Sequence, residues 1–298
     1  DEVRRQLPGL PPSAVIGEPA KRDTAPCIGL AAGQIAAHDA DATLVVMPSD
    51  HVIQPPEKLR EAIDLAVRLV EERPERIVTF GIKPTYPAET FGYIERGEPL
   101  NSERDSPAAF HVARFREKPD AAAAKAYLDS GKFYWNSGIF VWKAQTILRE
   151  LGEHQPDMRK KLDRINAALG REDYQEILDR EFPSIRGVAI DYAGMEHAKE
   201  TVGVEAPFEW DDLGTWQSLA RLHGADLDGN TSIGKHLAVE TKGTIVRSSN
   251  DHLIVTIGLK DAIVVHTPDA TLVAAKDQEE RVREIVERIK EREWDEYL

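Results

Sequence analysis

Acidic side chains in two separate segments of the chain could bind a divalent cation. The first, Asp50, directly follows the apolar run at residues 43–47, which has the composition of a buried strand. Mg²⁺ is held in proteins by carboxylates together with substrate phosphates, so a carboxylate at the tip of a strand suits it. The alternative is a turn residue, and helix capping explains Asp50 poorly because residues 52–56 precede the next expected helix. We expect the adjacent His51 to be structural.

The second acidic segment spans residues 207–216 and contains Asp211 and Asp212. Asp50 and Asp212 could meet at one Mg²⁺, as in the metal clamps of phosphoryl and nucleotidyl transfer. The alternative for Asp212 is structural, because it could cap a helix expected at residues 216–222. The residues alone leave both interpretations open.

A charged loop precedes a helix expected at residues 24–38, and the N-terminus of such a helix favours an anion. Lys21 or Arg22 in this loop could neutralise a phosphate. The Glu18 carboxylate could instead accept the N1 and N2 hydrogens of a guanine edge.

Two further polar segments could contact a ligand rich in hydroxyl groups. Lys118, next to Glu117, is a candidate for contact with a sugar or phosphate, although such a pair on a surface is more often only solvated. Asn136 offers an amide, and Gly138 lets the backbone approach a ligand closely. The same segment, residues 135–138, is also a good turn.

These residues need a scaffold in which strands alternate with helices. Residues 43–47 predict a central strand buried on both faces, and residues 77–82 predict the next strand, parallel to it. Helices are expected at residues 24–38 with Thr24 as the cap, from Pro55 onward with one apolar stripe over residues 59–70, and at residues 120–130 with Asp120 as the cap. The pattern indicates an α/β fold with a doubly wound sheet, in which ligands bind at the carboxyl ends of strands.

The pattern changes after Gly224, so we place a domain boundary there, with a catalytic domain at residues 1–223 and a small β-domain at residues 224–298. Short β-rich runs follow at residues 244–246, 253–257, 263–266 and 272–274. Their even spacing predicts a few coils of a β-solenoid, with an ordinary antiparallel sheet as the alternative. A charged helix with one apolar face is expected at residues 277–292.

Composition restricts the function further. The chain has 298 residues and a formal net charge of −14, which disfavours binding to nucleic acid or to an anionic membrane surface. The single cysteine, Cys27, rules out an internal disulfide and a cysteine-based zinc site, and we expect it to be a buried hydrophobe in a reducing, cytoplasmic protein. No apolar run reaches the ~18 residues that a membrane span needs. The chain opens within a helical pattern, which predicts that the natural protein starts further upstream.

Seven segments between about residues 14 and 222 carry a family resemblance: EPAKRDTAPCIGLAA, VVMPSDHVI, FGIKPTYPAETFGYIERG, FREKPD, WNSGIFVWKA, AIDYAGMEHA and EWDDLGTW. In order and spacing they resemble the sugar-1-phosphate nucleotidyltransferases, and within these the enzymes that make GDP-mannose and pyrophosphate from GTP and mannose 1-phosphate. The resemblance implies a mixed sheet in a Rossmann-like nucleotide-binding core, a small C-terminal β-domain, and Mg²⁺ as the cofactor. If that β-domain is a solenoid, we expect its coils to be left-handed.

The resemblance also implies roles for particular residues. Asp50 and Asp212 would hold the Mg²⁺, and Glu18 with the backbone of Thr24 and Ala25 would lie near the guanine. The mannose 1-phosphate site would be lined by Gly92, Glu117, Lys118, Asn136 and Gly138, and Asp191 falls in a further motif of the family. Arg22 as a phosphate ligand is an inference from its charge.

One family feature has no match in the sequence: a glycine-rich loop of the type AGGxGxRLxPL with a lysine soon after it, which cradles the triphosphate. We therefore expect an incomplete form of an active enzyme. The alternatives are a sugar-1-phosphate uridylyltransferase and a catalytically inactive sugar-nucleotide-binding or regulatory homologue. The small β-domain and the C-terminal helix are candidate surfaces for a homodimer.

Overall fold

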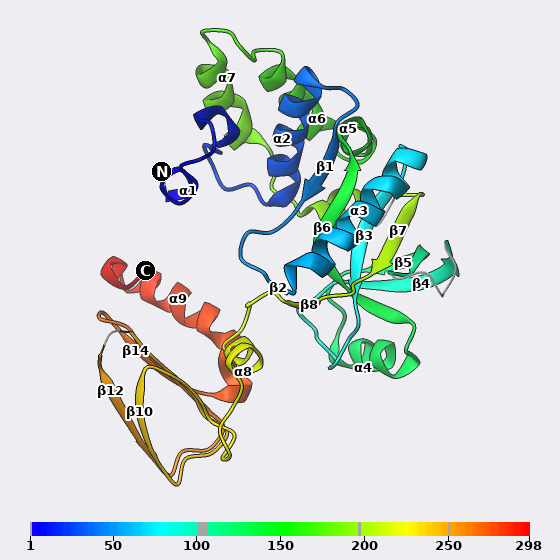
Figure 1. Ribbon diagram of the computed structural model, residues 1–298. Coiled ribbons are helices and arrows are strands. Elements are labelled where there is room, and N and C mark those ends of the chain that lie inside the picture. The colour runs from blue at the N-terminus through cyan, green and yellow to red at the C-terminus, as the bar shows by residue number, and fades with distance from the viewer. Residues whose placement is uncertain (1, 101–106, 196–197, 250) are drawn as a thin grey trace. The chain divides into compact units, whose positions relative to one another are not determined.

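Apolar strands and amphipathic helices alternate through the N-terminal part of the chain and build a six-stranded sheet with helices on both faces (Figure 1). The computed structural model describes residues 2–100, 107–195, 198–249 and 251–298. The strands of this sheet are β1 (Thr43–Val46), β3 (Ile77–Ile82), β4 (Tyr93–Pro99), β5 (Ala109–Arg116), β6 (Phe133–Lys143) and β7 (Thr201–Glu205). The helices of this part are α1 (Glu2–Gln6), α2 (Thr24–His38), α3 (Pro56–Glu72), α4 (Ala121–Ser130), α5 (Ala144–His154), α6 (Pro156–Asn166) and α7 (Tyr174–Glu181). Short 3₁₀ turns lie at η1 (Pro12–Ala14) and η2 (Phe182–Ser184), and one π-helical turn lies at η3 (Asp191–Met195).

The sheet is mixed, as the resemblance implied. Its strand order is β1-β6-β3-β7-β5-β4, and β4 also pairs with β6. β3 and β7 are parallel, whereas the other described pairs are antiparallel. β1 and β3 are both antiparallel to β6, so they run parallel to each other as expected, with β6 between them.

The two faces of the sheet carry separate hydrophobic cores. On one face, α2, α5 and α6 cover the buried rings of Phe140 and Trp142. On the other face, α3 packs Ala66 and Val70 against Phe80. The apolar stripe predicted for α3 is therefore confirmed, and residues spaced three and four apart in that helix bury one side of it.

The position of β1 differs from the expectation of a central strand buried on both faces. β1 stands at one end of the strand order, and Val45 is 39% exposed although Leu44 is buried. A continuous apolar run indicates a strand that packs against something, but it does not say how many neighbouring strands pair with it.

A close packing contact in this sheet gives a stability prediction. Gly203 of β7 lies opposite Phe110 of β5, and a Cβ added at Gly203 would come within 2.5 Å of the buried Phe110 ring. We expect Gly203→Ala to lower the free energy of unfolding by about 2 kcal/mol, because overpacking a rigid core forces rings or backbone to move. Urea unfolding measures this, and Gly152→Ala, where the added Cβ makes only an ordinary contact, is the control. An unchanged midpoint for Gly203→Ala would contradict the prediction.

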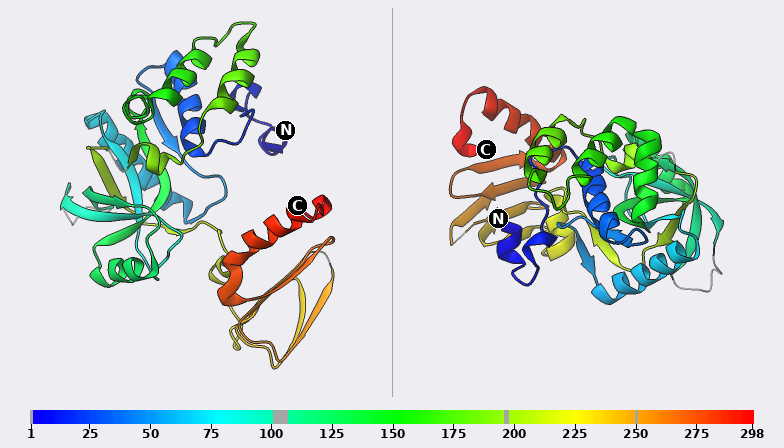
Figure 2. Two further views of the ribbon diagram at one scale, coloured as in Figure 1. Left: turned by 180° about the vertical axis from the view of Figure 1, so that it is seen from behind. Right: turned by 90° about the horizontal axis from the view of Figure 1, so that it is seen from above.

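The C-terminal part is a short β-solenoid. Its elements are α8 (Gln217–His223), β9 (Thr231–Ile233), β10 (Lys235–Val239), β11 (Ile245–Ser248), β12 (Leu253–Ile257), β13 (Ala262–His266), β14 (Thr271–Ala275), the 3₁₀ turn η4 (Lys276–Arg281), α9 (Val282–Glu291) and the 3₁₀ turn η5 (Asp295–Tyr297). β10 is parallel to β12, and β11 is parallel to both β9 and β13, so the strands form successive turns (Figure 2). Only the last strand, β14, pairs antiparallel among the described strands of this part. The parallel pairing confirms the solenoid and excludes the ordinary antiparallel sheet.

Two details of this part differ from the sequence prediction. β9 and β10 were not expected, because Gly234 and several polar residues interrupt their apolar pattern. The helix expected at residues 277–292 begins as the η4 turn and becomes α-helical at Val282. Within the described residues no helix combines the length and the apolar character needed to cross a bilayer.

The chain divides into two compact units, and each unit is made of two separate stretches of the sequence. The first unit comprises Asp1–Ser49 with Ile53–Trp210, and the second comprises Asp50–Val52 with Asp211–Leu298. A two-stranded sheet of β2 (Val52–Gln54) and β8 (Glu209–Asp211) lies where the chain passes from one unit to the other. α8 belongs to the second unit because Leu219 and Ala220 pack on its core, so this division falls before the boundary predicted at residues 223 and 224.

Candidate functional site

A cluster of polar side chains in the first unit centres on Asn136 of β6. The pairing of β6 with β3 shifts between Thr79 and Gly81, and Asn136 lies at this irregularity. The Asn136 backbone N–H donates to the carbonyl of Gly92 over 2.8 Å. The segment is therefore a bulged strand and not the turn that was its alternative, and Gly138 has a φ of 71° that suits glycine.

Gly92 is the point where Glu117 approaches this cluster. A Cβ at Gly92 would lie 2.5 Å from Glu117 Oε2 and 3.6 Å from the Asn136 Cβ. The Glu117 side chain is only 10% exposed, whereas Lys118 is 60% exposed and places its Nζ 3.9 Å from Glu117 Oε1. The absence of a side chain at Gly92 thus leaves room for the Glu117 carboxylate beside the Gly92 backbone.

Asp191 joins the same cluster at the start of η3. The Asn136 amide donates from Nδ2 to Asp191 Oδ1 over 2.9 Å. Burial raises the pKa of Asp191 and is the largest influence on it, while the Asn136 hydrogen bond and the charge of Lys118 lower it. The charge of Asp23 raises it further. The structure therefore brings together Gly92, Glu117, Lys118, Asn136 and Asp191, all of which the sequence analysis had singled out.

The start of α2 is held against the segment that leads into Asp191. Thr24 Oγ1 accepts a hydrogen bond from the Ile190 N–H over 2.8 Å, and the Ala25 N–H donates to the Val188 carbonyl over 3.1 Å. The prediction that Thr24 caps this helix is wrong, because Asp23 is the cap and its Oδ1 accepts from the Thr24 N–H. Asp23 has a φ of 65°, a conformation that is strained for a residue other than glycine.

Arg22 is partly committed to the protein itself. Its Nε and Nη2 donate to the Pro183 carbonyl, and its Nη1 donates to the carbonyl of Lys21. A guanidinium carries five N–H groups, so part of it stays available to an anion.

Cys27 is exposed, which corrects the expectation of a buried hydrophobe. Its position in the first turn of α2 places it close to the exposed Glu18. Desolvation by surrounding protein, a hydrogen bond with Glu18 and the negative charge of Glu18 raise the pKa of Cys27 to about 12. The Cys27 side chain is therefore exposed, but we expect its thiol to be poorly reactive because its pKa is raised.

The raised pKa of Cys27 predicts slow alkylation of its thiol. A pKa near 12 lowers the thiolate fraction at pH 8 about a thousandfold, and the higher nucleophilicity of a more basic thiolate recovers about thirtyfold of that. We expect iodoacetamide to react roughly thirtyfold more slowly with the native protein than with the unfolded chain at pH 8. The label reports one site, since the chain has a single cysteine. Glu18→Gln should accelerate the reaction, and equal native and unfolded rates would contradict the prediction.

The two proposed metal ligands both belong to the second unit. Asp50 is exposed, and Asp212 is partly buried with its Oδ1 accepting from the Gly214 N–H over 3.0 Å. Asp212 does not cap a helix, because α8 begins at Gln217 and has no side-chain cap. The capping alternative for Asp212 is therefore excluded.

The pKa of His51 is influenced by these carboxylates. Burial lowers the pKa of His51, while the negative charges of Asp50, Asp212 and Asp211 all raise it. Asp211 forms an ion pair with Arg221 and also accepts from the Leu213 N–H. Both Asp211 and Asp212 accept a backbone N–H within this turn, but Asp211 is also neutralised by Arg221, so Asp50 and Asp212 remain the candidate ligands.

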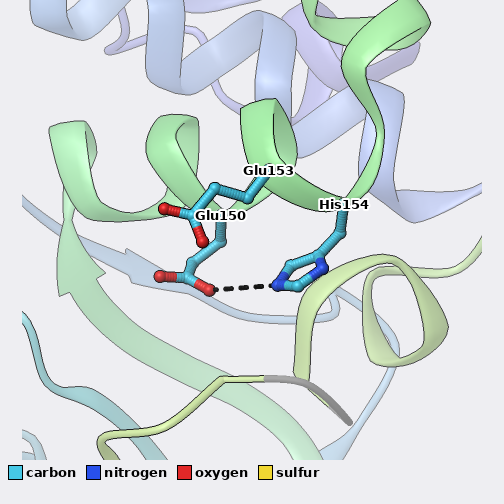
Figure 3. Close-up of side chains that lie close together, drawn as sticks. All are labelled: Glu150, Glu153 and His154. Carbon is cyan, nitrogen blue, oxygen red and sulfur yellow. Dashed lines mark ion pairs between the residues drawn. The ribbon is translucent and has the colours of Figure 1, made fainter.

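A separate group of metal-ligand type lies on α5 (Figure 3). One ligand atom from each of Glu150, Glu153 and His154 lies within 4.8 Å of the others, and no further such group of three occurs among the described residues. Glu150 pairs with His154 at 3.7 Å and with Arg149 at 3.4 Å. The pairing of Glu150 with His154, four residues apart in the helix, is the ordinary pattern of a charged helix surface.

One residue of the Asn136 cluster was missed from the sequence. Thr79 lies in β3, is fully buried, and places its hydroxyl 2.8 Å from Asn136 Oδ1. A hydroxyl inside an otherwise apolar buried strand was the available signal, because burying it without a hydrogen bond is costly. Of the AIDYAGMEHA segment, residues 196 and 197 lie outside the described residues.

Comparisons with known proteins agree with this architecture. The profile of the nucleotidyl transferase family matches residues 10–229, and that of the MannoseP isomerase/GMP-like beta-helix domain matches residues 234–289. The chain is 38% identical over 290 residues to the xanthan biosynthesis protein XanB of Xanthomonas campestris, and 36% identical over 295 residues to the mannose-1-phosphate guanylyltransferase of Escherichia coli K12. Each alignment covers 97% of this chain but 60% of the relative, so the chain spans about 60% of the length of these curated relatives.

A solved structure supports the same assignment. The crystal structure described as mannose-1-phosphate geranyltransferase from Thermus thermophilus superposes with a TM-score of 0.80 at 30% sequence identity. The match covers 92% of this chain and 77% of that one. Since the family profile covers more than half of the sequence and the fold agrees, the chain belongs to the nucleotidyl transferase family.

Proposed function

We propose that the chain carries the guanylyltransferase activity that makes GDP-mannose and pyrophosphate from GTP and mannose 1-phosphate. The observation that carries the proposal is the convergence of Gly92, Glu117, Asn136 and Asp191 at one place in the first unit. These groups offer carboxylate acceptors and an amide donor, which is the chemistry that a sugar with several hydroxyl groups requires. Relatives named mannose-1-phosphate guanylyltransferase indicate which sugar phosphate and nucleotide to test.

In the proposed reaction a phosphate oxygen of mannose 1-phosphate attacks the α-phosphorus of GTP, and the bond from that phosphorus to the pyrophosphate oxygen breaks. Little covalent chemistry falls to the protein, so its contribution is to position the two reactants and to neutralise charge. Lys118, which is 60% exposed beside Glu117, would neutralise the sugar phosphate. Glu18 would accept the N1 and N2 hydrogens of guanine.

Asp50 and Asp212 would hold a divalent cation, for which we propose Mg²⁺. These residues suit a hard divalent cation, because both are carboxylates, both belong to the second unit, and both raise the pKa of His51 through their charge. Once bound, the cation would neutralise the negative charge of the nucleotide phosphates. Arg22 would contribute to a phosphate only through the N–H groups that do not already bind carbonyls.

The test measures pyrophosphate release by the full natural protein with mannose 1-phosphate and each of GTP, UTP, dTTP, ATP and CTP. We expect GTP to give a kcat/KM at least about a hundredfold above that of any other nucleotide, because a hydrogen-bonded base edge discriminates strongly. Preference for UTP would replace the proposal by a uridylyltransferase. No release with any nucleotide, together with binding of GDP-mannose, would identify a non-catalytic homologue.

A homodimer and a cytoplasmic location stay predictions from the sequence.

A further inference from the structure

The buried hydroxyl of Thr79 has two neighbours that both accept hydrogen bonds. Thr79 Oγ1 lies 2.8 Å from Asn136 Oδ1 and 3.0 Å from the Ile139 carbonyl oxygen. A hydroxyl has one proton, so it can donate fully to only one of the two at a time. Asn136 Oδ1 also accepts a hydrogen bond from the Gly138 N–H over 3.4 Å, so Thr79 is the closer of two donors that fix the orientation of this amide.

The Asp191 carboxylate selects between the two arrangements. An ionised carboxylate only accepts hydrogen bonds, so the NH₂ end of the Asn136 amide must face Asp191. The Asn136 Oδ1 then faces Thr79, and Thr79 must donate to it. If Thr79 donated to Ile139 instead, Asn136 Oδ1 would keep only the longer hydrogen bond from the Gly138 N–H, at 3.4 Å, and the amide would be held less firmly in this orientation.

We propose that Thr79 is a positioning residue, whose hydroxyl proton fixes the Asn136 amide so that Asn136 donates to Asp191 and leaves this carboxylate oriented to accept a hydroxyl group of the sugar. The inference rests on the proposed function for its substrate, since it assigns the sugar hydroxyls to Asn136 and Asp191. Thr79 does not itself touch the substrate, because it is fully buried.

The proposal has a consequence for the charge of Asp191. Burial raises the pKa of Asp191 most and the charge of Asp23 raises it further, whereas a hydrogen bond from its own backbone N–H, the Asn136 amide and the charge of Lys118 lower it. An Asn136 amide held at its oxygen by the Gly138 N–H alone would stabilise the carboxylate less. Loss of the Thr79 hydroxyl should therefore raise the pKa of Asp191, while the effects of the Lys118 and Asp23 charges on that pKa stay the same.

The first experiment follows the Asp191 carboxyl by NMR in protein labelled with ¹³C at the aspartate carboxyl, with Asp191→Asn to assign the signal. Thr79→Val keeps the shape of the side chain and removes the hydroxyl, whereas Thr79→Ser keeps the hydroxyl. We expect the Asp191 carboxyl to titrate about one pH unit higher in Thr79→Val than in the unmodified protein. In Thr79→Ser it should titrate at the same pH as in the unmodified protein. Identical titration of Thr79→Val and the unmodified protein would overturn the proposal, as would an equal shift in Thr79→Ser.

The second experiment measures steady-state kinetics of the full natural protein and the same variants. Thr79→Val should raise the KM for mannose 1-phosphate about tenfold and change the KM for GTP less than about twofold, and Thr79→Ser should restore the first value. Equal changes in both KM values would indicate a merely structural role and overturn the proposal. If no nucleotide supports activity, the proposed function fails, and the NMR titration alone then decides whether Thr79 positions Asn136 and Asp191. Thermal unfolding of both variants checks that each is folded.

Discussion

Asp50→Asn is expected to lower the rate of pyrophosphate release by at least about a hundredfold at saturating substrates. The change keeps the size of the side chain and removes its negative charge, so one of the two proposed carboxylate ligands becomes a weak one. A divalent cation contributes several kcal/mol of charge stabilisation in transfer reactions of this kind, and each 1.36 kcal/mol corresponds to about a tenfold change in rate. Asp212→Asn should cause a loss of similar size, because we propose that the two carboxylates bind the same ion.

The control for this prediction is Asp251→Asn, the same chemical change in the same unit. Asp251 is 94% exposed and pairs only loosely with Lys235 at 3.2 Å, so its loss should leave the rate unchanged. EDTA should abolish the activity, and added Mg²⁺ should restore it. Near-normal turnover of Asp50→Asn would remove Asp50 from the mechanism.

The second large effect is expected for Gly92→Ala. The new Cβ would lie 2.5 Å from Glu117 Oε2, which is closer than nonbonded atoms approach, so the carboxylate must move. A displaced charged hydrogen-bonding group costs about 1.5–3 kcal/mol of ligand binding, which corresponds to roughly a ten- to hundredfold loss in kcat/KM for mannose 1-phosphate.

Stability should respond very differently to this change. The atom in the way is the end of a flexible side chain, and alanine at this position also reduces the freedom of the unfolded chain, so we expect the melting temperature to change little. Gly152→Ala is the matched control, because the added Cβ meets only Arg159 Cγ at 3.7 Å. Loss of stability without loss of sugar-phosphate affinity would contradict our assignment of Glu117 to the site.

The strands and helices of the first unit could largely be predicted, because each depends on a pattern within the segment itself. β3 was predicted with the bounds it has, and α4 with its Asp120 cap, whose Oδ1 accepts from the Ala123 N–H. The edge position of β1 depends on strand pairing over long distances in sequence, which no local pattern contains. The exposure of Cys27 likewise depends on what packs beside the first turn of α2.

The site shows the same distinction. Asn136 and Gly92 could be found as polar and small residues in recognisable segments, but their contact depends on the bulge in β6 and on the pairing of β6 with β4. Thr79 escaped notice because threonine is common in strands. In the solenoid, the even spacing of the β-rich runs corresponds to half a coil: Ile245 pairs with Ile263 of the strand after next.

The three residues Asp50–Val52, which belong to the second unit although the chain on both sides of them belongs to the first, limit how this protein can be recombined. A domain exchange made by joining two relatives near residue 211 would transplant the solenoid with Asp212, but would leave Asp50–Val52 from the other parent. Such chimeras should work only when that tripeptide is exchanged as well. The second unit is therefore built from two separate stretches of the chain, and sequence divergence in the solenoid unit is expected to be matched by change at a short stretch far upstream.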